Sequence, residues 1–98
     1  MEPVPHILVV DDHRDIRDLL ARYLVKQGLR ASVAENAAAA RRVMQSAGID
    51  LVVLDIMMPG EDGLSLTRSI REKHGIPVIL LTAMGEETDR IAGPVTRL

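Results

Sequence analysis

Cysteine is absent from this 98-residue chain, which excludes disulfides and thiolate metal sites. Aromatic side chains are nearly absent too, since Tyr23 is the only one, so a core must come from aliphatic residues and methionine. No apolar run approaches the roughly 20 residues of a membrane span, and the acidic, proline-containing N-terminus is not a signal peptide. With 12 basic and 14 acidic residues, no charge excess attracts nucleic acid or an anionic membrane. We therefore expect a cytoplasmic chain that itself binds neither.

Hydrophobic residues are plentiful at 47%, and four short segments of the sequence predict strands. In chain order these are residues 7–10, 30–35, 51–54 and 78–81. The first, third and fourth are apolar runs typical of buried strands, whereas 30–35 is predicted as a strand because it is short and bounded. Helical patterns lie between them, and a further helix is expected to begin within residues 86–92. Strands alternating with helices at this spacing predict an α/β domain with a parallel sheet.

The predicted helices carry start and stop signals. The first has an apolar stripe that we expect to face the core, and Gly28 is placed to end it. Asn36 is placed to cap the second helix, and Gly75 to end the third. The stripe of the first helix consists of Ile16, Leu19, Leu20, Tyr23 and Leu24.

Polar side chains directly follow three of the four predicted strands. Asp11 and Asp12 follow the first predicted strand, Asp55 follows the third, and Thr82 follows the fourth. The carboxyl ends of parallel strands meet at one edge of the sheet, so we expect these residues to converge. An oxygen-only site with several carboxylates and no histidine or cysteine donors suits a hard cation such as Mg²⁺, and a carboxylate can also act as a nucleophile toward phosphorus.

Three segments of the sequence resemble the receiver domain of bacterial two-component response regulators, most closely the OmpR-type transcriptional regulators. They are residues 7–12, 55–63 and 77–83. The resemblance implies that Asp55 accepts a phosphoryl group from a sensor histidine kinase. It also implies Mg²⁺ ligation by Asp11, Asp12, Asp55 and the backbone carbonyl of Met57. Thr82 would be the switch hydroxyl, and the small side chain of Ala83 would leave room for the phosphoryl group.

The same resemblance implies a flavodoxin-like, doubly wound parallel sheet, but the sequence departs from the family after about Gly93. The active-site lysine of the family is absent, since the only lysines are Lys26 and Lys73. We therefore expect residues 1–98 to be a truncated receiver domain with strand order 2-1-3-4, lacking the fifth strand and fifth helix. The open edge of the fourth strand, together with a bared face around Val9 and Leu54, then predicts a homodimer, formed either by edge pairing or by exchange of the C-terminal segment 86–98.

The leading functional hypothesis is a phosphorylation-dependent signalling switch that uses Mg²⁺ and is not an enzyme in the strict sense. Its DNA-binding output domain would lie outside this chain. A signalling-incompetent dimerisation module is the alternative, because the lysine is missing. A Mg²⁺-dependent phosphatase with an aspartyl-phosphate intermediate is weaker, because that class needs an aspartate where Met57 stands. His13, beside the acidic pair, is either a soft-metal ligand or, as we prefer, a solvent-facing residue at a helix start.

Overall fold

A parallel five-stranded sheet with helices on both faces forms the fold. The computed structural model describes residues 4–55, 63–81 and 95–97. In chain order the elements are β1 (His6–Val10), α1 (Arg14–Lys26), β2 (Arg30–Ala34), α2 (Ala37–Ser46), β3 (Leu51–Asp55), α3 (Gly63–His74), β4 (Val78–Leu81) and β5 (Val95–Arg97). The strand order is β2-β1-β3-β4-β5, and every pair is parallel. The predicted doubly wound, flavodoxin-like order 2-1-3-4 is confirmed.

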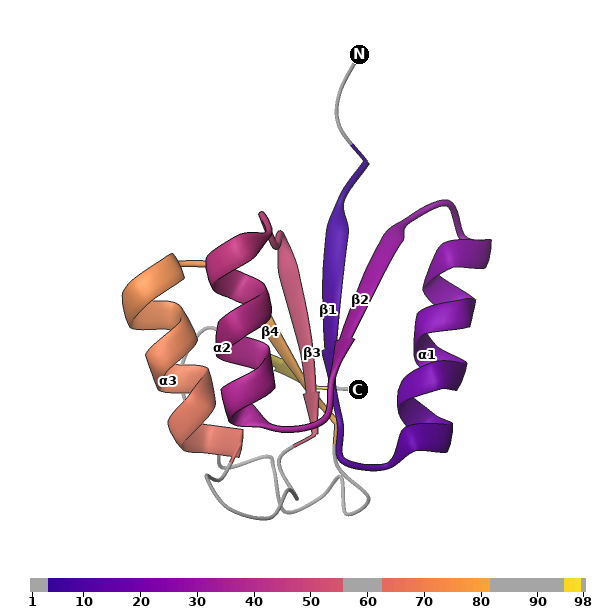
Figure 1. Cartoon of the computed structure of the whole chain (residues 1–98). Coiled ribbons are helices and arrows are strands. Elements are labelled where there is room, and N and C mark those ends of the chain that lie inside the picture. Colours follow the sequence, from indigo (N-terminus) through magenta and orange to yellow (C-terminus); the bar gives the residue numbers. More distant parts are fainter. Residues whose placement is uncertain (1–3, 56–62, 82–94, 98) are drawn as a thin grey trace.

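The two faces of the sheet are covered unequally. Figure 1 shows α1 on one face, with α2 and α3 side by side on the other. The main cluster of buried side chains lies between the sheet and this helix pair, and it includes Leu8, Val10, Leu54, Leu66 and Leu80, each fully shielded from solvent. Among the described residues, no helix is long and apolar enough to cross a membrane.

The predicted helix signals are confirmed where the structure describes them. The side chain of Asn36 accepts a hydrogen bond of 2.8 Å from the backbone N–H of Ala39, which caps α2. Gly28 and Gly75 follow α1 and α3 with φ of 89° and 66°, a backbone region that favours glycine. The expected helix start at 86–92 lies outside the described residues.

The expectation that the fifth strand is missing is wrong, and so is the open outer edge of β4. Val95 pairs with Val78 and Arg97 with Leu80, so β5 continues the parallel ladder beyond β4. The physical reason is that the unpaired N–H and C=O groups of a buried strand need partners. The segment between β4 and β5 is also as long as a parallel crossover requires, about a dozen residues. No helix follows β4 among the described residues.

The predicted core stripe of α1 is also wrong in part. Ile16, Leu19 and Tyr23 are exposed to 45%, 64% and 56%, while Leu20 and Leu24 are half-buried. α1 packs on β1 and β2 at one side of the sheet, so only part of its circumference meets other residues.

The expectation that the sheet is exposed around Val9 and Leu54 is also wrong. Leu54 belongs to the buried cluster under α2 and α3, on the face opposite α1. Val9 is completely buried. Most exposed large apolar side chains of the described residues lie on α1, and the others are Val4, Val33 of β2 and Leu64 of α3. None of them lies on the central strands β1, β3 and β4.

Candidate metal centre

The sheet brings the predicted acidic residues together at the carboxyl ends of β1 and β3. Asp11 directly follows β1, and its backbone N–H donates to the carbonyl of Ala34 at 3.1 Å, which holds it in line with β2. Asp55 is the last residue of the neighbouring strand β3. One carboxylate oxygen from each of Asp11, Asp12 and Asp55, together with a ring nitrogen of His13, all lie within 4.8 Å of one another. The convergence that the sequence predicted for these three aspartates is thus present.

The three carboxylates differ in their burial. The Asp11 side chain is 3% exposed, that of Asp55 12% and that of Asp12 27%. The backbone N–H of His13 donates to Asp11 Oδ1 at 2.8 Å, which fixes that carboxylate in the turn between β1 and α1. In contrast, Asp12 Oδ1 is shielded from solvent and accepts no hydrogen bond within the described part of the chain. A buried oxygen of this kind favours a cation as its partner.

His13 turns its ring toward the acidic group. Its Nδ1 atom lies 3.0 Å from Asp12 Oδ1, 3.2 Å from Asp11 Oδ1 and 3.9 Å from Asp55 Oδ2. The hydrogen bond to Asp11, followed by the charge of Asp12, raises the pKa of the His13 imidazole above its ordinary value. The expected solvent-facing role is therefore wrong in part: the side chain is 61% exposed, yet its Nδ1 faces the carboxylates.

Arg17, on the helix beside the acidic pair, also belongs to this site. Its guanidinium Nη1 donates to the backbone carbonyl of Asp11 at 3.0 Å, which ties the first turn of α1 to the end of β1. The only sequence signal for this contact is a basic residue one turn into the helix that follows the acidic pair.

The donor set fits a hard divalent cation. Three carboxylates lie together, and one of their oxygens is buried without a hydrogen bond among the described residues. Carboxylate oxygens are the protein ligands that Mg²⁺ prefers, and it usually keeps several waters besides one or two of them. Three further predicted site residues, Met57, Thr82 and Ala83, lie outside the described residues.

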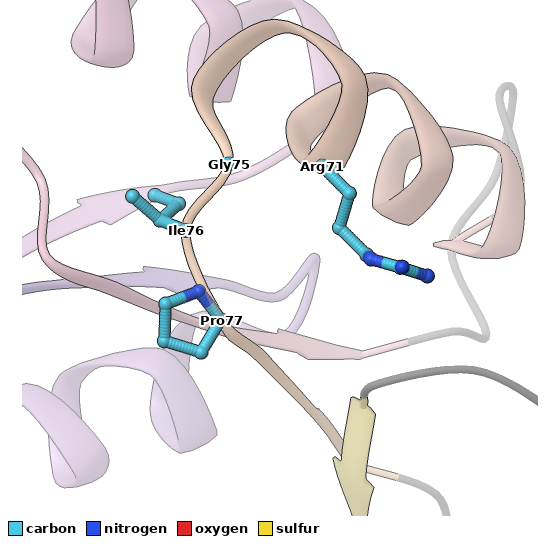
Figure 2. A pocket seen from close by; sticks show the side chains of 4 residues that line it. All are labelled: Arg71, Gly75, Ile76 and Pro77. Carbon is cyan, nitrogen blue, oxygen red and sulfur yellow. The ribbon is translucent and has the colours of Figure 1, made fainter.

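Two surface hollows lined by described residues lie away from the acidic group. One hollow of about 340 Å³ is lined by Arg71 of α3 and by Gly75, Ile76 and Pro77, which lead into β4 (Figure 2). These residues stand at the amino end of β4, whereas the acidic group follows the carboxyl ends of β1 and β3. No carboxylate lines this hollow among the described residues, so the chemistry of the site lies at the acidic group.

Comparisons with known proteins agree with this geometry. Residues 7–95 match the response regulator receiver domain. Protein PetR of Rhodobacter capsulatus is 51% identical over 89 residues, which are 91% of this chain and 38% of that protein. The chain thus spans less than half the length of this curated relative.

Two solved structures extend the comparison. The response regulator TrrA of Thermotoga maritima, in complex with Mg²⁺-BeF, has a TM-score of 0.85 at 37% identity, covering 97% of this chain and 87% of TrrA. A complex of the histidine kinase ThkA with TrrA matches with a TM-score of 0.79 at 37% identity, covering 97% and 86%.

Proposed function

The chain belongs to the family of response regulator receiver domains, and on that premise we propose that Asp55 is the phospho-acceptor of a phosphorylation-dependent signalling switch. The observation that carries the proposal is the convergence of Asp11, Asp12 and Asp55 within 4.8 Å at the carboxyl edge of the sheet. Asp55 is the one of the three that ends a central strand. β3 lies between β1 and β4, and Asp55 itself pairs with Leu81 of β4. A carboxylate held in this way is positioned to act as a nucleophile.

The proposed transfer begins at a phosphohistidine of the donor kinase. A carboxylate oxygen of Asp55 attacks the phosphorus atom, and the bond between phosphorus and the imidazole nitrogen breaks. The electron pair of that bond stays on the nitrogen, which then takes up a proton, and Asp55 becomes an acyl phosphate. Asp55 is 12% exposed, so a phosphoryl group must approach from the solvent side, beyond the end of the strand.

Asp11, Asp12, Asp55 and the backbone carbonyl of Met57 are the proposed ligands of Mg²⁺. When bound, Mg²⁺ neutralises negative charge on the carboxylates and on the transferring phosphoryl oxygens. Asp11 is held by the His13 N–H and, through its own carbonyl, by Arg17, so its carboxylate is preorganised for the ion. We propose Thr82 as the switch hydroxyl that donates to the phosphoryl group, with the small Ala83 leaving access to it.

A sensor histidine kinase is the proposed partner. The structural match to TrrA in complex with the kinase ThkA supports this proposal. The curated relative PetR is much longer than this chain, so we propose that DNA binding, the expected output of an OmpR-type regulator, belongs to a domain outside these residues. Kinases of this class draw on ATP, and we therefore propose that the switch operates in the cytoplasm.

As a receiver domain the chain is a signalling domain and not a classical enzyme. We propose that any autophosphatase activity is weak.

Acetyl phosphate with Mg²⁺, followed by intact-protein mass spectrometry, tests the proposal. We expect one added phosphate on the wild type and none on Asp55→Asn. Asp15→Asn is the matched control, because Asp15 is an exposed carboxylate in the first turn of α1 and should leave labelling unchanged. Labelling of the Asp55→Asn variant would contradict the assignment. A folded wild type that binds Mg²⁺ and never gains phosphate would instead favour the signalling-incompetent dimerisation module.

The exposed apolar side chains of α1 support a second proposal, a homodimer. Ile16, Leu19 and Tyr23 form one stripe at helical spacing, and Val33 is exposed on the neighbouring strand β2. Burial of such a stripe is favourable by about 25 cal/mol for each Å² of apolar area. A two-fold contact between α1 helices, and not the pairing of β4 edges expected from the sequence, would bury it.

Sedimentation of the wild type and Leu19→Glu tests the homodimer. Leu19 is the most exposed of the large apolar side chains among the described residues, so a charge there should not disturb the core. We expect a concentration-dependent dimer for the wild type and a monomer for the variant. Glu72→Gln on α3 is the control and should sediment like the wild type. A wild type that remains monomeric at all concentrations would refute the proposal.

A further inference from the structure

The acidic site contains a nitrogen donor besides its oxygens. The Nδ1 atom of His13 lies 3.0, 3.2 and 3.9 Å from carboxylate oxygens of Asp12, Asp11 and Asp55. Donors about 2.1 Å from a shared ion lie about 3.0 Å apart at right angles and about 4.2 Å apart across it. In the ion-free protein Nδ1 forms a hydrogen bond with Asp11 and ion pairs with the carboxylates. Two of the separations match donors at right angles and the third is shorter than the distance across an ion, so Nδ1 and the three oxygens can share one ion without moving apart.

The backbone holds His13 in this position. His13 is the N-cap residue of α1, with φ −90° and ψ 110°, and its side chain makes no capping hydrogen bond. Its N–H donates to Asp11 Oδ1, and its carbonyl accepts from the N–H of Arg17 at 3.0 Å. The main chain is therefore fixed on both sides, and the ring needs no backbone movement to reach an ion held by the three carboxylates.

We propose that His13 is a metal ligand through Nδ1, and that it gives this site a preference for divalent transition metals such as Co²⁺ that the carboxylates alone would not provide. Imidazole suits Zn²⁺, Ni²⁺ and related ions, whereas Mg²⁺ is bound by carboxylate, carbonyl and water oxygens. The buried Oδ1 of Asp12, which accepts no hydrogen bond among the described residues, is the oxygen closest to Nδ1. Nitrogen and oxygen donors thus face the same point.

The inference concerns the proposed metal site and rests on the function proposed for it. The two fail in different ways. If the site binds no Mg²⁺ and Asp55 takes no phosphate, the proposed function fails. If Mg²⁺ binds but His13 has no influence on the choice of metal, only the inference fails.

Calorimetric titration of the metal-free protein with Co²⁺ and with Mg²⁺ at about pH 8, above the ordinary pKa of an imidazole, tests the inference. The proteins compared are the wild type, His13→Asn and, as a matched control, His74→Ala, since His74 is an exposed histidine in the last turn of α3. We expect His13→Asn to lose about tenfold or more in Co²⁺ affinity, because loss of even an outer partner of a ligand costs about 10–100-fold. Its Mg²⁺ affinity should stay within about threefold of that of the wild type.

The visible spectrum of bound Co²⁺ gives a second readout, because it changes when a nitrogen ligand is replaced by oxygen. We expect the wild-type and His74→Ala spectra to agree and the His13→Asn spectrum to differ. Circular dichroism verifies that each variant is folded. Equal Co²⁺ affinities in wild type and His13→Asn would overturn the inference, as would a parallel loss of Co²⁺ and Mg²⁺ affinity or a dependence of Co²⁺ binding on His74.

Discussion

The metal-free protein should become more stable when Asp12, one of its own proposed ligands, is replaced by asparagine. Asp12, Asp11 and Asp55 each place an oxygen within 4.8 Å of the others. Two unit charges 4.8 Å apart repel by about 3.5 kcal/mol at an effective dielectric constant of 20 and by about 0.9 kcal/mol in bulk water. Asp12→Asn removes the repulsion between Asp12 and each of the other two carboxylates, and it keeps the shape of the side chain.

The net gain should be smaller than the full repulsion. The Asp12 side chain is 27% exposed, and the N–H of His13 already offsets part of the charge on Asp11. We therefore expect the free energy of unfolding to rise by about 1–2 kcal/mol. The comparison belongs at about pH 9, well above the ordinary pKa of an imidazole, so that a protonated His13 compensates less of the charge of Asp12.

Urea unfolding followed by circular dichroism, first in EDTA and then in excess Mg²⁺, measures this effect. The free energy of unfolding of the wild type should increase with the logarithm of the ratio of the Mg²⁺ concentration to the dissociation constant Kd. The increase for Asp12→Asn should be much smaller. Glu72→Gln, which removes an exposed carboxylate on α3, should match the wild type in both conditions. If Asp12→Asn is less stable than the wild type in EDTA, the repulsion argument is refuted.

Three further predictions concern titration and packing. Because the folded-state pKa of His13 is raised above 6.5, its contribution to metal-free stability should be complete below about pH 6.5 and lost as the pH rises through the folded pKa. The urea concentration at the midpoint of unfolding, measured for His13→Asn across this pH range, should not show this loss of stability. Asn36→Ala, which removes the cap of α2, should lower the free energy of unfolding by about 1 kcal/mol in the same assay. Leu66→Ala should lower it by about 2–5 kcal/mol, because Leu66 is fully buried, and a drop below about 1 kcal/mol would contradict its placement in the core.

Local signals predicted the parts of this molecule that local physics decides. The four predicted strands are β1 to β4 of the structure. Three of them were recognised because short runs of β-branched and aliphatic residues fit a sheet covered on both faces. Asn36 and Gly28 marked helix ends, because capping and positive φ depend on only a few neighbouring residues. Parallel order then determined that Asp11 and Asp55 would meet.

Features that depend on distant partners were not predicted. Residues Val95–Arg97 carry a short β-branched segment after a proline, and only the unpaired side of β4 makes them a strand. The periodicity of the α1 sequence correctly identified an apolar stripe on the helix. It could not predict how much of this stripe the sheet covers, and Leu19 is exposed in the structure. The ring of His13 faces its sequence neighbours Asp11 and Asp12 most closely, and only its third carboxylate partner, Asp55 at 3.9 Å, comes from a distant strand.

The central position of β1 has a consequence for the kinetics of folding. β1 pairs with β2 across one helix, but it pairs with β3 only after the chain has returned from α2, with Ile7 against Leu51. The first pairing closes the shorter loop, so we expect it to form early and the second to form late. An ion held between Asp11, Asp12 and Asp55 bridges the late pair of strands. Contacts that form after the transition state mainly slow unfolding. Metal occupancy should therefore lengthen the lifetime of the native state while leaving the rate of its formation nearly unchanged.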